Sequence, residues 1–131
     1  MGTDDYVEIQ QLLARYCHVV DNKQWDQLAS IFTPDAGVTV VGIYPRTTGI
    51  EAIIPLYSTV MRHPLAHEST SLIVTEESET VTRIASKWVT VRANGNAGAG
   101  VYEDEVVRTS EGWRIKERVA RPVAAPDTIL L

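Results

Sequence analysis

The chain has 131 residues, a length typical of a single domain with a substantial hydrophobic core. Hydrophobic residues make up 44% and charged residues 22%, as in ordinary globular proteins, and the net charge of -5 provides no basic stripe for nucleic acid or an anionic membrane. No apolar run is long enough to span a bilayer, and the acidic N-terminus lacks a signal-peptide core, so we expect a cytoplasmic protein. The single cysteine excludes an internal disulfide and a cysteine-based zinc site.

The first half of the chain carries the 3.6-residue periodicity of amphipathic helices. We expect three helices, from Thr3 or Asp4 to about Asp21, from Gln24 to Phe32, and from Thr48 or Gly49 to about Arg62. Pro55 predicts a kink or a late start in the third helix. Between the second and third helices, residues 33–37 (TPDAG) predict a turn, 38–43 a short strand and 44–49 a loop.

From Ala66 onward the apolar residues alternate with polar ones, a pattern typical of strands. We expect four strands, over 66–75, 79–93, 97–110 and 112–121, joined by hairpin turns. Helices followed by a meander of long strands predict an α+β fold, a cone-shaped curved antiparallel sheet with three N-terminal helices enclosing a pocket. Residues 1–131 would form one domain, with the apolar tail 122–131 packing on the domain or on a neighbouring subunit.

The glycine-rich segment GNAGAG at 95–100 is not a phosphate-binding loop. Its glycine spacing differs from the dinucleotide fingerprint, and it joins two expected strands instead of opening a helix. We interpret it as a hairpin turn.

Asp21 is the first candidate for a chemical role. It follows Leu13 and Cys17 at steps of four, which places its carboxylate on the buried edge of the first helix, where desolvation is costly. It could instead serve the helix end, by bonding the turn at Asn22 or by pairing with Lys23.

The three histidines differ in their surroundings. His18 lies on the polar side of the first helix, and His63 is a helix-end residue. Pro64 breaks the helix that would align His63 with His67 for a metal, so we expect no metal site. His67 begins a strand, and an imidazole held there by Asp21 would be an oriented base that works near neutral pH.

Several motifs resemble one known family. They are Tyr16-x4-Asp21-x-Lys23-x-Trp25-Asp26, Leu28-Ala29-x-Ile31-Phe32-x-Pro34-Asp35-Ala36, His67-x2-Thr70-x-Leu72 and Asp104-x3-Arg108-x3-Gly112-Trp113-Arg114-Ile115. Together they cover most of residues 5–121, and they resemble SnoaL-like proteins of the nuclear-transport-factor-two-like superfamily. The most similar patterns are those of scytalone dehydratase, hexachlorocyclohexane dehydrochlorinase and bile-acid 7α-dehydratase.

The resemblance implies catalytic roles for three residues. Those enzymes share a catalytic Asp–His dyad, and Asp21 and His67 fall on its two positions. Tyr16 falls where the bile-acid enzyme has a tyrosine. The chain departs from scytalone dehydratase in having no histidine after His67. The dehydrochlorinase has a pocket arginine near its last strand, where this chain has Glu117.

Further pocket residues are expected on the long strands. Trp88 and Tyr102 are candidates to line the pocket or, equally, to pack in the sheet core. By strict alternation one face of the last strand holds Trp113, Ile115, Glu117 and Val119, and the other Arg114, Lys116 and Arg118. Glu117 would then be an inward, substrate-binding acid, or a partner for Arg108 or Arg92.

These features predict a cofactor-independent lyase or isomerase, dehydratase-like, that acts on a hydrophobic, cyclic small molecule. Two alternatives stay open: a non-catalytic ligand-binding or assembly domain of the same fold, and the small subunit of a ring-hydroxylating dioxygenase. We also expect a homodimer or homotrimer, because the outer sheet face would expose apolar residues. These residues are Ala85, Val89, Val91 and Val106.

Overall fold

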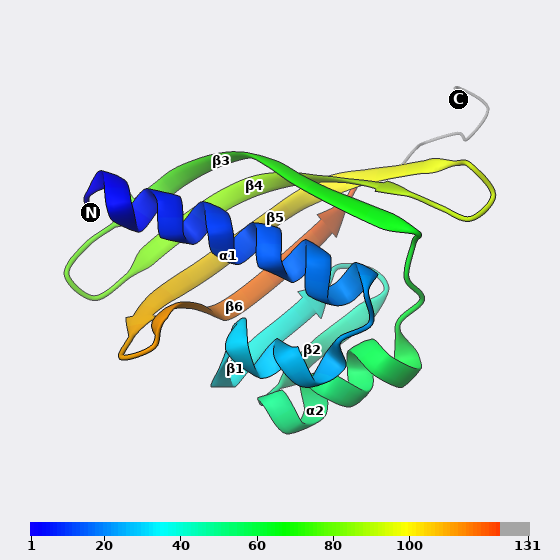
Figure 1. The fold of residues 1–131 in the computed structure, drawn as a ribbon, viewed down its shortest axis with the longest axis horizontal. Coiled ribbons are helices and arrows are strands. Elements are labelled where there is room, and N and C mark those ends of the chain that lie inside the picture. Colours follow the sequence, from blue (N-terminus) through cyan, green and yellow to red (C-terminus); the bar gives the residue numbers. More distant parts are fainter. Residues whose placement is uncertain (124–131) are drawn as a thin grey trace.

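The computed structural model describes residues 1–123, which form a curved six-stranded sheet with helices on one side (Figure 1). In chain order the elements are α1 (Thr3–Asp21), η1 (Trp25–Ser30), β1 (Phe32–Val40), β2 (Tyr44–Thr48), α2 (Ile50–Pro55), η2 (Leu56–Val60), β3 (Ala66–Glu77), β4 (Thr82–Val91), β5 (Ala97–Thr109) and β6 (Gly112–Pro122). The predicted α+β class is confirmed, and the sheet is open. Most of the tail 122–131, whose packing was predicted, lies outside the described residues.

The sheet is mixed, which corrects the expectation of an all-antiparallel sheet. Its strand order is β2-β1-β6-β5-β4-β3, and β3 to β6 form the predicted antiparallel meander. β1 pairs in parallel with β6, although these two strands lie far apart in the sequence. The short strand β2, expected as a loop, pairs with β1 as a hairpin at the sheet edge.

Helix α1 crosses the concave side of the sheet and packs against β3 and β6 (Figure 1). Its apolar stripe is buried, including Ile9, Leu12 and Tyr16. The helix ends as predicted at Asp21, because the chain reverses through Lys23, which has a left-handed φ of 56°. This ending places Asp21 beside the start of β3.

The other two helical segments are shorter and less regular than expected. The second is a 3₁₀ helix, Trp25–Ser30. The third begins after Gly49 and changes from α to π geometry after Pro55, which lacks the amide hydrogen needed to continue the α pattern. Within residues 1–123, no helix is long and apolar enough to cross a membrane.

The turn predicted over 33–37 is wrong, because these residues lie inside β1. They do, however, interrupt the regular pairing of β1 with β6. Phe32 pairs with Ile115 and the next pair is Gly37 with Glu117, so the turn-forming residues bulge between two regular stretches.

A second bulge, at Lys116 in β6, changes which side chains face inward. Glu105 pairs with Glu117 and Val106 pairs with Ile115, so Lys116 has no partner on β5. The strict alternation predicted for this strand is therefore wrong beyond Ile115. The buried residues are Trp113 and Ile115 before the bulge, and Arg118 and Ala120 after it.

Candidate functional site

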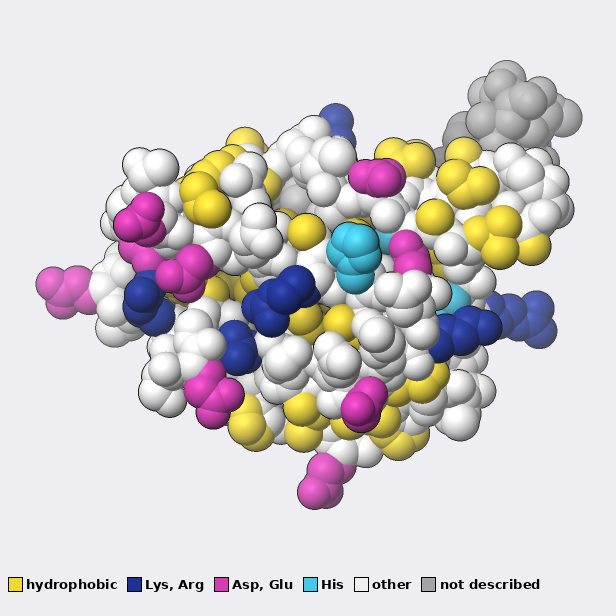
Figure 2. All heavy atoms as spheres, in the orientation of Figure 1, with side chains coloured by type: hydrophobic (Ala, Val, Ile, Leu, Met, Phe, Trp, Pro, Cys, Tyr) yellow, Lys and Arg dark blue, Asp and Glu magenta, His cyan; other side chains and the backbone are white. Residues whose placement is uncertain are grey.

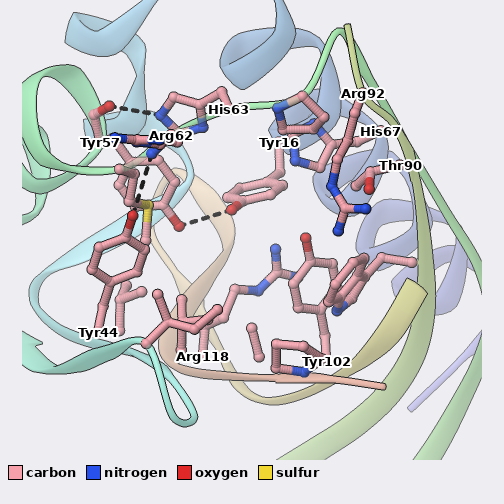
Figure 3. A pocket seen from close by; sticks show the side chains of 18 of the residues that line it. Tyr16, Tyr44, Tyr57, Arg62, His63, His67, Thr90, Arg92, Tyr102 and Arg118 are labelled. Carbon is pink, nitrogen blue, oxygen red and sulfur yellow. Dashed lines mark hydrogen bonds between the residues drawn. The ribbon is translucent and has the colours of Figure 1, made fainter. Parts of the chain in front are cut away.

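A cavity of about 510 Å³ lies between the helices and the concave face of the sheet (Figure 3). It is lined by side chains from α1, β1, β2, η2, the four long strands and the loops next to them: Tyr16, Val38, Val40, Ile43, Tyr44, Tyr57, Met61, Arg62, His63, Pro64, His67, Trp88, Thr90, Arg92, Ala93, Tyr102, Arg118, Ala120 and Pro122. The tyrosines at 16, 57 and 102 are buried, whereas Ile43, Arg62 and Arg92 are exposed. The cavity therefore has a buried floor and an exposed mouth.

Asp21 and His67 meet at this cavity. His67 Nδ1 lies 2.5 Å from Asp21 Oδ1, and the backbone amide of His67 donates to Asp21 Oδ2 at 3.0 Å. The carboxylate thus uses both oxygens to hold the beginning of β3 against the end of α1. The His67 side chain is 9% exposed and that of Asp21 is 23% exposed, so the acid is only partly buried.

The Asp21 contact determines which imidazole nitrogen is available. An ionised carboxylate only accepts hydrogen bonds, so Nδ1 of His67 carries the proton that it donates to Asp21. The neutral ring then has its lone pair on Nε2, which has no hydrogen-bond partner within residues 1–123. This is the geometry of an oriented general base.

Tyr16, the third predicted residue, is paired with a residue that we did not predict. Its hydroxyl lies 2.8 Å from the hydroxyl of Tyr57, and both line the cavity (Figure 3). One hydroxyl proton serves this mutual bond, which leaves the other for a ligand. Burial raises the pKa of Tyr16 and of Tyr57, so both remain protonated donors at neutral pH.

Arg118 forms the floor of the cavity beneath the tyrosines (Figure 3). Its Nε and Nη2 donate to the two oxygens of Asp104 at 2.8 and 3.0 Å, and both side chains are buried. Burial alone would lower the pKa of Arg118, but the charge and hydrogen bonds of Asp104 raise it well above its usual value. The guanidinium carbon lies 3.6 Å from the ring centre of Tyr102 and 4.3 Å from that of Tyr16.

Trp88 and Tyr102 line the cavity, and they also pack together with ring centres 5.9 Å apart. Within residues 1–123, the buried Trp88 Nε1 and Arg118 Nη1 have no hydrogen-bond acceptor. Buried donors without acceptors are costly, and they are typical of sites that hold a polar ligand group.

His63 also lines the cavity but is held differently. Its Nε2 bonds the Tyr57 carbonyl oxygen at 2.7 Å, and its ring stacks on Tyr57. Burial lowers the pKa of His63, which keeps the ring neutral, so Nε2 is the donor to that carbonyl. His63 thus has a supporting role in the cavity wall.

The inward placement of Glu117 is wrong. Its carboxylate accepts hydrogen bonds from Arg46 Nε and Nη2 at 3.0 and 2.8 Å, and it lies outside the cavity. The Lys116 bulge is the cause, because it turns Glu117 outward and Arg118 inward. The partner arginine is Arg46, and neither Arg108 nor Arg92.

No group of three or more histidine, cysteine, aspartate or glutamate residues within residues 1–123 is placed to hold a metal ion. On the face that carries α1, charged side chains of both signs are interspersed and basic ones form no continuous stripe (Figure 2).

Known proteins share this fold and sequence pattern. A sequence model of the SnoaL-like domain matches residues 2–119. An uncharacterized protein of Mycobacterium tuberculosis is 32% identical over 129 residues, covering 88% of this chain and 83% of that protein. A candidate aromatic ring hydroxylase of Novosphingobium aromaticivorans superposes with a TM-score of 0.79 at 27% identity, over 94% of this chain and 92% of that one. A Nostoc punctiforme protein of unknown function with a cystatin-like fold has a TM-score of 0.83 at 17% identity, over 95% and 96%.

Proposed function

The chain belongs to the SnoaL-like family, and from that premise we propose that it is a cofactor-independent lyase or isomerase. Proteins of this fold often act as isomerases, cyclases or dehydratases on small molecules. The proposed substrate is a hydrophobic, cyclic small molecule, because the cavity is lined mainly by aromatic and aliphatic side chains. The observation that carries the proposal is the contact between Asp21 and His67 at the cavity wall.

In the proposed reaction, Nε2 of His67 takes a proton from a substrate carbon. The electron pair of the broken C–H bond forms an enolate or a carbon–carbon double bond. In an elimination, the group on the adjacent carbon leaves with its bonding pair, and a hydroxyl of the Tyr16–Tyr57 pair protonates it. The proton that His67 took from carbon then passes to the ionised tyrosine, which restores both residues, and the products are an alkene and the protonated leaving group.

The floor of the cavity supplies charge stabilisation. Arg118 stacks against Tyr16 and Tyr102, and its positive charge favours negative charge on an oxygen held by the tyrosine hydroxyls. General-base catalysis contributes about 10²–10⁴-fold, so this preorganised environment and correct positioning must supply the remainder.

Proton abstraction is common to elimination and isomerisation, so it can be tested before the substrate is identified. We expect the protein to accelerate exchange of hydrogen for deuterium next to the carbonyl of bicyclic ketones such as 2-tetralone, followed by NMR in D₂O. The His67→Gln variant should lose this acceleration and keep its fold, because a side chain facing a cavity contributes little packing. Exchange at the same rate with His67→Gln would contradict the proposal and favour a non-catalytic binding domain.

A further inference from the structure

The charged side chains that line the cavity directly are all basic, and Asp21, which contacts His67, is not among the lining residues. Among its lining residues are Arg62, Arg92 and Arg118, and no aspartate or glutamate. Arg118 is paired with Asp104, whereas Arg62 and Arg92 form no ion pair with any carboxylate within residues 1–123. In a chain of net charge -5, two cations without acids at the mouth of one cavity are not explained by composition.

Arg92 is oriented toward the cavity by the end of β4. Trp88, Thr90 and Arg92 alternate onto the inward face, and Nη1 of Arg92 donates to the carbonyl oxygen of Ala97 at 3.1 Å. Figure 3 shows the Arg92 guanidinium pointing into the cavity beside Thr90. The anchored Nη1 leaves the edge formed by Nε and Nη2, which has no partner within residues 1–123.

The same edge binds carboxylates elsewhere in this protein. Arg118 holds Asp104 through Nε and Nη2, and Arg46 holds Glu117 through the same two atoms. Planar, two-point contacts of this kind match the geometry of a carboxylate. Arg92 therefore presents half of such a pair to the cavity.

Gly98 makes the placement of Arg92 possible. A Cβ atom at this position would lie 2.6 Å from Thr90 Oγ1 and 2.9 Å from Arg92 Nη2, so any side chain would displace both groups. Gly100, two residues along β5, leaves room for the Trp88 ring in the same way. The glycine-rich segment, interpreted as a turn, thus also extends into β5 and shapes the cavity wall.

We propose that Arg92, Thr90 and Gly98 form a carboxylate-binding subsite at the cavity mouth. The ligand is then amphipathic: its apolar ring lies among the aromatic side chains of the floor, and its acidic group reaches Arg92. The Thr90 hydroxyl is a second donor beside the guanidinium, and Arg62 adds positive charge at the mouth. This inference deepens the proposed function, since it rests on the cavity being the substrate site.

Calorimetry with two matched probes tests the subsite without requiring turnover. Naphthalene-2-carboxylate and naphthalene-2-carboxamide share the same ring and differ in charge. At low ionic strength we expect the acid to bind at least about tenfold more tightly than the amide, from a charge-assisted two-point contact. 2-Naphthyl phosphate serves as a third probe. Tighter binding of the phosphate than of the carboxylate would contradict the proposal that the acidic group of the ligand is a carboxylate.

Variants test which residues cause the preference for the acid over the amide. Arg92→Gln and Gly98→Ala should each reduce the affinity for the acid to that for the amide. Arg83→Gln, which removes an exposed arginine paired with Glu76, should leave the preference unchanged. Equal binding of the two probes by the wild type, including no binding of either, would overturn the proposal, as would a preference that survives in Arg92→Gln. His67→Gln should keep the preference, so failure of the subsite and failure of the proposed chemistry give different results.

Discussion

At the scale of single residues, the proposed function depends on how Asp21 holds His67. One carboxylate oxygen accepts from the ring and the other from the backbone amide, so Asp21 fixes both the rotamer and the tautomer of His67. The tautomer matters for the proposed reaction, since it leaves the lone pair of Nε2 for the substrate.

Replacing Asp21 with Asn should separate shape from charge. The amide oxygen can still accept from the His67 backbone, but the amide nitrogen would donate to Nδ1 and so move the ring proton to Nε2. We expect the rate of deuterium exchange to fall by about 10²–10⁴-fold with an unchanged circular dichroism spectrum. Asp26→Asn, an exposed acid five residues along the chain, is the control and should change little. An active Asp21→Asn variant would show that the contact is structural.

At the scale of elements, the pairing of β5 with β6 buries an ion pair and exposes another. Asp104 and Arg118 face the cavity side, and the neighbouring Glu103 and Arg121 pair on the outer face. The two pairs have the same chemistry on the same two strands, so they separate the effect of burial from that of charge.

Asp104→Asn should be strongly destabilising. It leaves a buried guanidinium without a counter-charge, which typically costs about 3–5 kcal/mol in the free energy of unfolding. Glu103→Gln removes an exposed pair and should cost about 0–1 kcal/mol. Urea denaturation of the two variants measures the difference. Similar losses in both would mean that Arg118 reaches solvent or another acid.

The helices and strands also show how much of the fold local sequence patterns can predict. The periodicity of α1 and the alternation in β3 to β5 are local signals, and they predict these elements well because burial of one face dominates. The parallel pairing of β1 with β6 brings together strands that are far apart in the chain, so no local pattern indicates it. The bulge at Lys116 has the same character, because an unpaired residue is defined only by the partner strand.

The candidate site shows the same difference between what local sequence patterns indicate and what depends on contacts between distant parts of the chain. The sequence pattern indicates Asp21 and His67 separately, but only the family resemblance joins them as a dyad and adds Tyr16, since spacing alone does not show that residues on α1 and β3 meet. Arg118 was missed because strict alternation, continued through the bulge, placed it outside. Tyr57 was missed because it lies in a π segment, whose periodicity differs from that of an α helix.

At the scale of the whole molecule, the core contains tyrosine hydroxyls and a cysteine thiol that burial keeps protonated. Burial raises the pKa of Tyr16, Tyr57 and Tyr102, and it raises the pKa of the Cys17 thiol to about 11. The unfolded chain releases these protons near the ordinary values of 9.0 for cysteine and 10.0 for tyrosine. Above about pH 9 the unfolded state therefore binds fewer protons than the native state, and stability falls as pH rises.

We expect the urea midpoint to decrease steadily between about pH 9 and pH 11, with this contribution fully present below pH 9. Denaturation curves at a series of pH values, followed by circular dichroism, provide the measurement. A midpoint that stays constant over this range would mean that the tyrosine and thiol groups ionise as easily in the folded protein.

The outer sheet face bears on assembly. Val89 and Val91 are 46% and 47% exposed, as the strand phase predicted, and Ile73 is 59% exposed. Val106, expected on the same face, is buried in the core. Hydrophobic side chains also gather at the end of the molecule where β4 and β5 form a hairpin (Figure 2). We predict a homodimer or homotrimer, and light scattering that gives the mass of one 14.5 kDa chain at micromolar concentration would rule it out.

In the proposed mechanism, Asp21 leaves Nε2 of His67 as an unprotonated base in the cavity. Nitrogen-15 NMR of the histidine side chains, at a pH where the ring is neutral, measures the tautomer directly and needs no substrate. The expected result is a proton on Nδ1 of His67 in the wild type and a shift of that proton to Nε2 in Asp21→Asn. A proton on Nε2 in the wild type, or a tautomer that Asp21→Asn does not change, would contradict it.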